Sequence, residues 1–184
     1  MPGAGSANWK AQTGNTDRLL DGGELYALAV KGECSKVLTG GFDDGETFEV
    51  EWVLATNPEA PNTENRAAVF ESAPCAAVFE RGEGAWFENG LVYFVSTSGG
   101  AVNEGQVWVY DPKKESLTMQ YESRSALDVD GPDNIAVSKK GGIVLVRLLF
   151  SANRSFISST RDISFQSLLA NNNSAKTEEA TLSV

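Results

Sequence analysis

The sequence predicts an all-β fold, because short stretches of alternating apolar and polar residues recur along the chain and turn-forming residues separate them. The clearest alternation lies at residues 47–54, whose apolar positions are Phe48, Val50, Trp52 and Leu54. A spacing of two places these side chains on one face of a half-buried strand. No stretch has the spacing of an amphipathic helix, so the pattern favours strands throughout.

Further strands are expected at residues 76–80, 85–87, 91–96, 106–110, 117–122, 135–137 and 143–149. Asn89-Gly90 predicts a tight hairpin turn, because this pair favours positive φ. Asp111-Pro112 predicts a second turn, because proline fixes φ and aspartate caps the turn. The pattern fits a sandwich, a barrel or a propeller.

The two hairpins at residues 85–96 and 106–122 together have the form of a four-stranded propeller blade. One blade takes roughly 40 to 50 residues, so the chain has room for about three blades. Since that is too few to close the usual ring, we expect an incomplete β-propeller.

The composition of the chain changes near Gly142. All 18 Gly, all 6 Pro and all 4 Trp lie at or before this residue, and the sequence beyond it is rich in Ser and Asn. We therefore expect a partial β-propeller domain at residues 1–145 and an atypical tail at residues 146–184.

Composition also excludes several classes of function. The chain has no His, which excludes Ser-His-Asp and Cys-His catalytic systems and His-bearing zinc sites. The net charge of -10 argues against a nucleic-acid partner and suits a hard cation such as calcium. A solvated acidic surface is the commoner reason for such a charge. No apolar run is long enough to span a membrane, and residues 1–6 show no signal peptide.

The two cysteines, Cys34 and Cys75, are interpreted as small buried apolar residues. Their spacing leaves a disulfide between them open as the alternative.

Three segments in order, residues 77–86, 91–112 and 131–137, resemble the PhoX-type alkaline phosphatases. The resemblance covers roughly residues 76–142, with a weaker echo at residues 23–26. It implies a six-bladed propeller with a calcium and iron cluster at one end of its channel. It further implies hydrolysis of phosphate monoesters at alkaline pH and export to the periplasm or the extracellular space.

On the matching positions, the resemblance implies that Glu83 is a metal-binding carboxylate. It places Asp133 and Asn134 at the same channel mouth, as metal ligands or beside them. Carboxylate and amide oxygens are donors that calcium accepts. The alternatives are that Glu83 is a turn residue and that Pro132-Asp133-Asn134 is an Asx-type turn before a strand. No catalytic residue is assigned.

The resemblance fails in the strand that begins at Ile143. Members of the family end this strand in a Glu-Asp-Gly motif that contributes to the metal site, whereas this chain continues with Val146-Arg147-Leu148-Leu149-Phe150. We expect the sequence from about residue 146 to be foreign to the family, through a frameshift or an alternative gene end. Poor solubility, oligomerisation or a partly disordered tail from about Ser151 would follow. The chain is then a fragment that is inactive alone and oligomerises through open blade edges.

Two other functions fit the same residues. One is a calcium-dependent, lactonase-like propeller, because such enzymes also hold calcium with Glu, Asn and Asp at blade ends. The other is a non-catalytic propeller-like binding module, which the missing His and the missing acid both suit.

Overall fold

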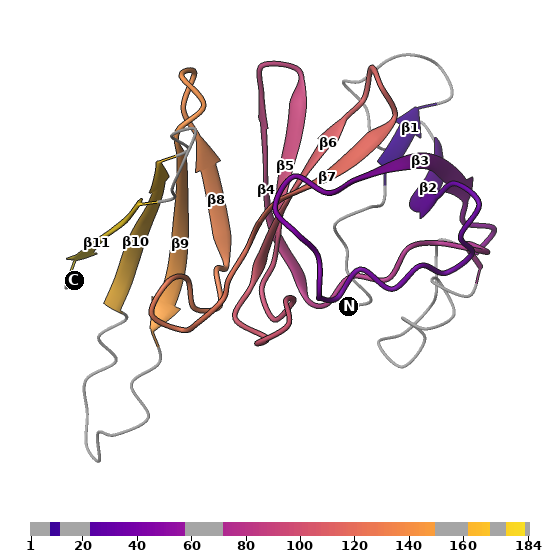
Figure 1. The fold of residues 1–184 in the computed structure, drawn as a ribbon. Coiled ribbons are helices and arrows are strands. Elements are labelled where there is room, and N and C mark those ends of the chain that lie inside the picture. The colour runs from indigo at the N-terminus through magenta and orange to yellow at the C-terminus, as the bar shows by residue number, and fades with distance from the viewer. Residues whose placement is uncertain (1–7, 12–22, 58–71, 150–161, 170–175, 183–184) are drawn as a thin grey trace, which may run out of the picture.

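The computed structural model describes residues 8–11, 23–57, 72–149, 162–169 and 176–182. All regular structure in these residues is β, which confirms the predicted fold class (Figure 1). The strands are β1 (Asn8–Ala11), β2 (Gly23–Val30), β3 (Thr47–Leu54), β4 (Gly82–Glu88), β5 (Leu91–Ser96), β6 (Gln106–Asp111), β7 (Ser116–Glu122), β8 (Asn134–Val137), β9 (Ile143–Leu149), β10 (Asp162–Leu169) and β11 (Lys176–Leu182).

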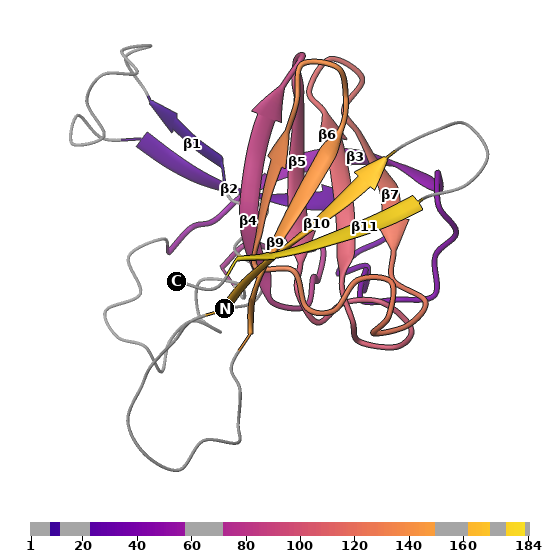
Figure 2. The same ribbon diagram turned by 90° about the vertical axis from the view of Figure 1, so that its left-hand side faces the viewer.

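The strands form two antiparallel sheets. The larger has the order β1-β2-β3-β7-β6-β5-β4, and the smaller has the order β11-β10-β9-β8. Strands β4 to β7 pair in succession, as the two predicted hairpins require of a blade. Strands β8 to β11 repeat that pattern, and β1 to β3 form a third, shorter set. These three sets stand side by side, as an incomplete propeller of about three blades predicts (Figures 1 and 2).

Both predicted turns are present. Asn89 and Gly90 have φ of 52° and 83° and join β4 to β5. The Asp111 carboxylate accepts hydrogen bonds from the amides of Lys113, at 2.9 Å, and Lys114, at 3.3 Å. Turn chemistry therefore sets these two hairpins as the sequence indicates.

The strand predicted at residues 76–80 does not form. This segment makes a single parallel bridge, between Val37 and Val78, and its amides bond to scattered partners. Ala77 donates to the Leu28 carbonyl at 2.7 Å, and Val78 donates to the Lys36 carbonyl at 2.8 Å. The segment is apolar because it packs on the core, which imitates the composition of a strand.

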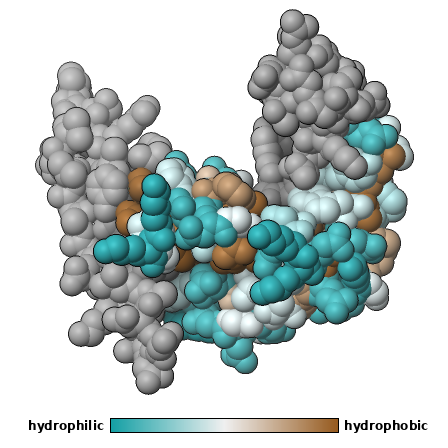
Figure 3. Space-filling model, turned by 90° about the horizontal axis from the view of Figure 1, so that it is seen from above, coloured by the Kyte–Doolittle hydropathy of each residue, from teal (hydrophilic) through white to brown (hydrophobic). Residues whose placement is uncertain are grey.

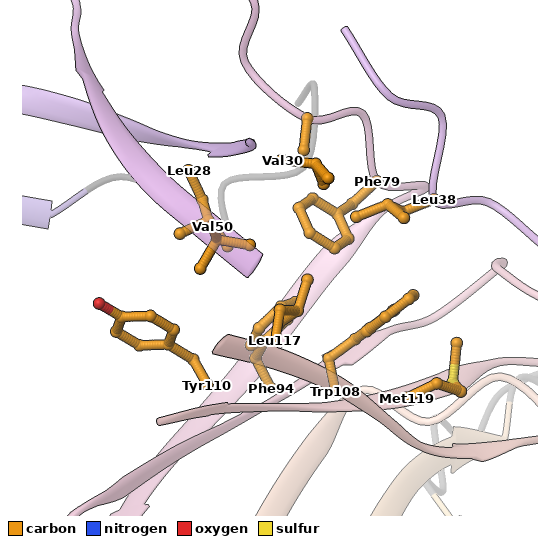
Figure 4. Packing of buried hydrophobic residues seen from close by; sticks show 11 residues of the cluster. Leu28, Val30, Leu38, Val50, Phe79, Phe94, Trp108, Tyr110, Leu117 and Met119 are labelled. Carbon is orange, nitrogen blue, oxygen red and sulfur yellow. The ribbon is translucent and has the colours of Figure 1, made fainter. Parts of the chain in front are cut away.

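We call the four strands β4 to β7 the central blade. The first hydrophobic core lies between strands β2 and β3 and this central blade (Figure 4). Trp108 is fully buried at its centre, with its ring 5.7 Å from that of Phe79 and 5.8 Å from that of Phe42. The other buried members are Leu28, Val30, Leu38, Val50, Ala77, Phe94, Tyr110, Leu117 and Met119. β3 pairs with β7, so β2, β3 and the central blade belong to one sheet that curls around this core.

A second core joins the central blade to β8 and β9. Its buried members are Val95, Val107, Val129, Ile135, Val137, Ile143 and Leu145. The central blade is therefore apolar on both faces, which is typical of a blade with neighbours on either side. The second core packs β8 against the central blade and thereby fixes the position of β8 beside β4.

The tail predicted to begin at residue 146 starts inside β9 and includes β10 and β11. Residues 150–161 and 170–175 lie outside the described residues, and Ser151 is among them. The foreign origin of the tail stays a prediction.

The two cysteines form a disulfide, with sulfur atoms 2.02 Å apart. The expectation of two buried apolar thiols is wrong: Cys34 is exposed and Cys75 is half-buried. The bridge forms because the two segments run side by side at the surface. The Ser35 amide donates to the Cys75 carbonyl at 3.3 Å, next to the Val37–Val78 bridge.

In the part of the chain that the structure describes, no helix has the length and apolar character needed to cross a membrane.

Candidate functional site

The blades have two different ends. The turn end carries the tight connections at residues 89–90, 112–115 and 138–142, and the loop end carries the longer connections at residues 97–105 and 123–133. Figure 3 views the turn end, where much of the described surface is hydrophilic. Its four lysines, Lys113, Lys114, Lys139 and Lys140, are exposed. They are solvated turn residues, remote from the loop end.

Glu83 lies in β4 at the loop end. Its side chain is 44% exposed, and its Oε1 atom is 3.8 Å from Nη2 of Arg81. The ladder between β4 and β5 shifts register between Gly82 and Ala85, so Glu83 lies in a local bulge of the strand. A bulge re-aims a side chain at the edge of a sheet, and here it presents an accessible carboxylate.

Asp133 and Asn134 lie where β8 begins, at the same end. The Asp133 amide donates to the Val146 carbonyl of β9 at 2.8 Å. The Asn134 side-chain oxygen accepts a hydrogen bond from the Ile135 amide at 2.8 Å. This bond reaches only the next residue, whereas an Asx-type turn bonds the amide two residues on, so it does not decide the alternative that the sequence left open.

The structure brings the predicted residues together through Gly84. The Gly84 amide donates to the Asp133 carbonyl at 3.0 Å. A Cβ atom at position 84 would lie 2.6 Å from Cα of Asn134, so no other residue fits without moving a strand. Glycine therefore permits β4 and the start of β8 to cross in contact, with Glu83 in β4, Asn134 at the first position of β8 and Asp133 just before it.

The donors of this site match calcium in type but not in number. Two carboxylates and an amide are hard oxygen donors, whereas calcium takes six to eight oxygens. Within the described residues, no group of three or more His, Cys, Asp or Glu side chains is placed to hold a metal. The chain offers iron no His or thiolate ligand, since it lacks His and both cysteines are in the disulfide.

A buried polar cluster at the loop end was not predicted. Glu122 is fully buried, and its carboxylate accepts hydrogen bonds from Gln106 Nε2 at 2.9 Å, the Ala101 amide at 3.0 Å and the Gly41 amide at 3.3 Å. Nη1 of Arg124 is 3.5 Å from the same carboxylate. A buried charge persists only with such partners, so this cluster is built around one ion.

The burial of Glu122 cannot be predicted from strict alternation of side chains along β7. Met119 pairs with Trp108, but Tyr121 pairs with Val107, so the β6–β7 ladder contains a bulge. Without the bulge, Glu122 would lie on the face opposite Met119. With it, Glu122 turns to the same face as Met119, into the interior. Nothing in the local sequence, a glutamate followed by Ser123 at the end of a strand, indicates this bulge.

The ionised form of Glu122 is favoured by its surroundings. Burial would raise its pKa, but hydrogen bonds from Ala101, Gln106, Gly41 and Phe42 together hold the pKa below its ordinary value. The carboxylate is therefore a permanent negative charge near neutral pH.

Arg147 stands in β9 where the resemblance leads one to expect an acid. Its Nη1 atom is 2.5 Å from Oδ2 of Asp130. Burial raises the pKa of the nearby Glu104, and so do the hydrogen bond and charge of Asp130, while Arg147 opposes the rise. Arg147 thus neutralises a carboxylate at the loop end instead of adding one.

Antiparallel blade-like sets of strands that stand side by side are compatible with an incomplete β-propeller. The family described as Alkaline phosphatase PhoX matches residues 5–182, and the chain belongs to this family. Its general function is therefore alkaline phosphatase-like, with phosphate monoesters as the substrate class. Members of the family are typically exported. No curated protein and no solved structure matches the chain.

Proposed function

We propose that this chain is part of a calcium-dependent phosphomonoesterase, and that Glu83, Asp133 and Asn134 bind the calcium ion at the loop end. The contact of β4 with β8 at Gly84 is the observation that carries the proposal. It places residues some fifty positions apart on crossing strands. Carboxylate and amide oxygens are donors that calcium accepts, so this contact supports a cation site here.

Calcium held there would supply positive charge to a phosphoryl group and lower the pKa of a bound water. Glu83 and Asp133 would hold the ion, and Asn134 would contribute an amide oxygen. Arg81, 56% exposed beside Glu83, offers a guanidinium to a phosphate oxygen. Iron is proposed only as the second metal that the family resemblance implies.

The test of the calcium site is a titration by calorimetry. We expect the wild-type chain to bind calcium and Glu83→Gln to weaken its affinity by about tenfold or more, because the substitution removes a charged ligand. Glu88→Gln is the matched control, since it removes the same charge at the other end of β4. Equal affinity in all three proteins would refute the assignment of Glu83.

We further propose that the chain is inactive alone, because Arg147 stands where a metal-site acid is expected and the blades are too few to close a ring. The same samples, given p-nitrophenyl phosphate with calcium and iron, are expected to release little or no nitrophenol. Turnover above the Glu83→Gln background would contradict the inactivity and would support the phosphatase assignment.

We propose that the chain associates with copies of itself through open blade edges. β4 ends its sheet, and beyond its contact with β8 at Gly84 its side chains Trp86 and Phe87 are 42% and 66% exposed. Light scattering after size exclusion is expected to show oligomers, and Phe87→Glu to shift them toward monomer. A monodisperse wild-type monomer with a sharp thermal transition would rule this out.

We propose that the chain functions outside the cytoplasm. The disulfide between Cys34 and Cys75 supports this, because such bonds persist in oxidising compartments.

A further inference from the structure

The carboxylate of Glu122 lies at the loop end but is not among the proposed ligands. We infer that Glu122 is a positioning residue, which fixes the glycine loop (residues 97–105) and through it the contact between β4 and β8. The effect on calcium rests on the proposed function; the anchoring of the strands does not.

The first step of the argument is that Glu122 joins two loops that touch through their backbones. Its carboxylate accepts from the Gly41 amide in one loop and from the Ala101 amide in the glycine loop. A Cβ atom on Gly40 would lie 2.8 Å from the carbonyl carbon of Gly100. The loops meet without intervening side chains, and the bonds to Glu122 hold them together alongside a direct bond from the Gly100 amide to the Thr39 carbonyl at 2.7 Å.

The second step is that the glycine loop reaches the start of both strands. The Thr97 amide donates to the Arg81 carbonyl at 2.9 Å, just before Gly82 opens β4. The Thr97 hydroxyl donates to the Pro132 carbonyl at 2.7 Å, just before β8 begins. The Gly131 amide donates to a carbonyl of the same loop at 2.9 Å. The loop is therefore a direct connection between Glu122 and the two strands.

The third step is that the negative charge of Glu122 strengthens its hydrogen bonds to the surrounding donors. Two backbone amides, the Gln106 amide group and the Arg124 guanidinium all face it, and all of them donate. Bonds to an ionised acceptor are the stronger kind. A glutamine at position 122 has nearly the same shape but turns an N–H toward at least one of these donors.

Amide hydrogen exchange, measured by NMR in calcium-free buffer, tests the inference. In Glu122→Gln we expect exchange at Gly41 and Ala101 to rise by about tenfold or more, because their acceptor is weakened. We expect Gly131 and Gly84, which do not touch Glu122, to follow, while amides in the middle of β6 keep their rates. Glu115→Gln, which removes the same charge just before β7, should change none of these. Calcium affinity should fall in Glu122→Gln and not in Glu115→Gln.

Faster exchange at Gly41 and Ala101 with no change at Gly131 and Gly84 would overturn the inference, because Glu122 would then act only locally. If the wild-type chain binds no calcium, the proposed function fails, and the exchange pattern still decides the positioning role. If Glu122→Gln does not fold, Arg124→Met replaces it. Arg124 is 52% exposed and contacts the same carboxylate, so we expect the same order of changes at smaller size.

Discussion

Trp108→Ala is expected to lower the free energy of unfolding by about 3 to 5 kcal/mol, the usual cost of truncating a buried aromatic residue. Trp108 is 0% exposed, and its ring stands 5.7 Å from Phe79 and 5.8 Å from Phe42 in edge-to-face contacts. Its indole N–H also donates to Gln106 Oε1 at 3.3 Å. The substitution therefore leaves a cavity between two blades and removes a partner from the polar cluster at the loop end.

Urea denaturation followed by circular dichroism measures this loss. Trp86→Ala is the matched control, because Trp86 is 42% exposed on the edge strand β4. We expect the control to cost well under half as much, in line with surface substitutions. Equal effects of the two substitutions would mean that strands β2 and β3 do not pack on the central blade around Trp108 as described.

Reducing the disulfide between Cys34 and Cys75 is expected to lower the free energy of unfolding by about 2 to 4 kcal/mol. The two cysteines are 41 positions apart, so the bond restricts a long loop of the unfolded chain. In the folded chain it joins segments that also share the Val37–Val78 bridge and the hydrogen bond from the Ser35 amide to the Cys75 carbonyl.

Thermal unfolding of the oxidised and the reduced protein measures the effect, with a Cys34→Ser, Cys75→Ser double variant as control. We expect the double variant to match the reduced protein and to ignore reductant. Two free thiols in the purified, unreduced protein, found by alkylation and mass spectrometry, would show that the bond does not form.

The sequence predicts the strands correctly where the alternation of side chains and the turn residues agree. The strands predicted at residues 47–54, 91–96 and 143–149 coincide with β3, β5 and β9. Each has a clear apolar face or a long β-branched and aromatic run, and the cores bury those side chains. The hairpins of the central blade followed from Asn89-Gly90 and the Asp111 turn.

Features that depend on long-range contacts were harder to predict. The segment at residues 76–80 is apolar for packing and not for pairing, and the disulfide of Cys34 depends on where that segment runs. Glu122 reaches the interior through a bulge, which alternation does not reveal. β1, β2, β10 and β11 also went unpredicted.

For the site, the family resemblance suggested Glu83, Asp133 and Asn134. The crossing of β4 and β8 is a property of the fold. It follows from the second core, which packs β8 against the central blade, and no local spacing encodes it.

A crystal structure of the chain grown with calcium tests the central claim most directly. We predict an ion between β4 and β8, bound by a Glu83 carboxylate oxygen and by oxygens of Asp133 or Asn134, and absent from crystals of Glu83→Gln. An ion bound elsewhere on the chain, with Glu83 turned into solvent at saturating calcium, would contradict it.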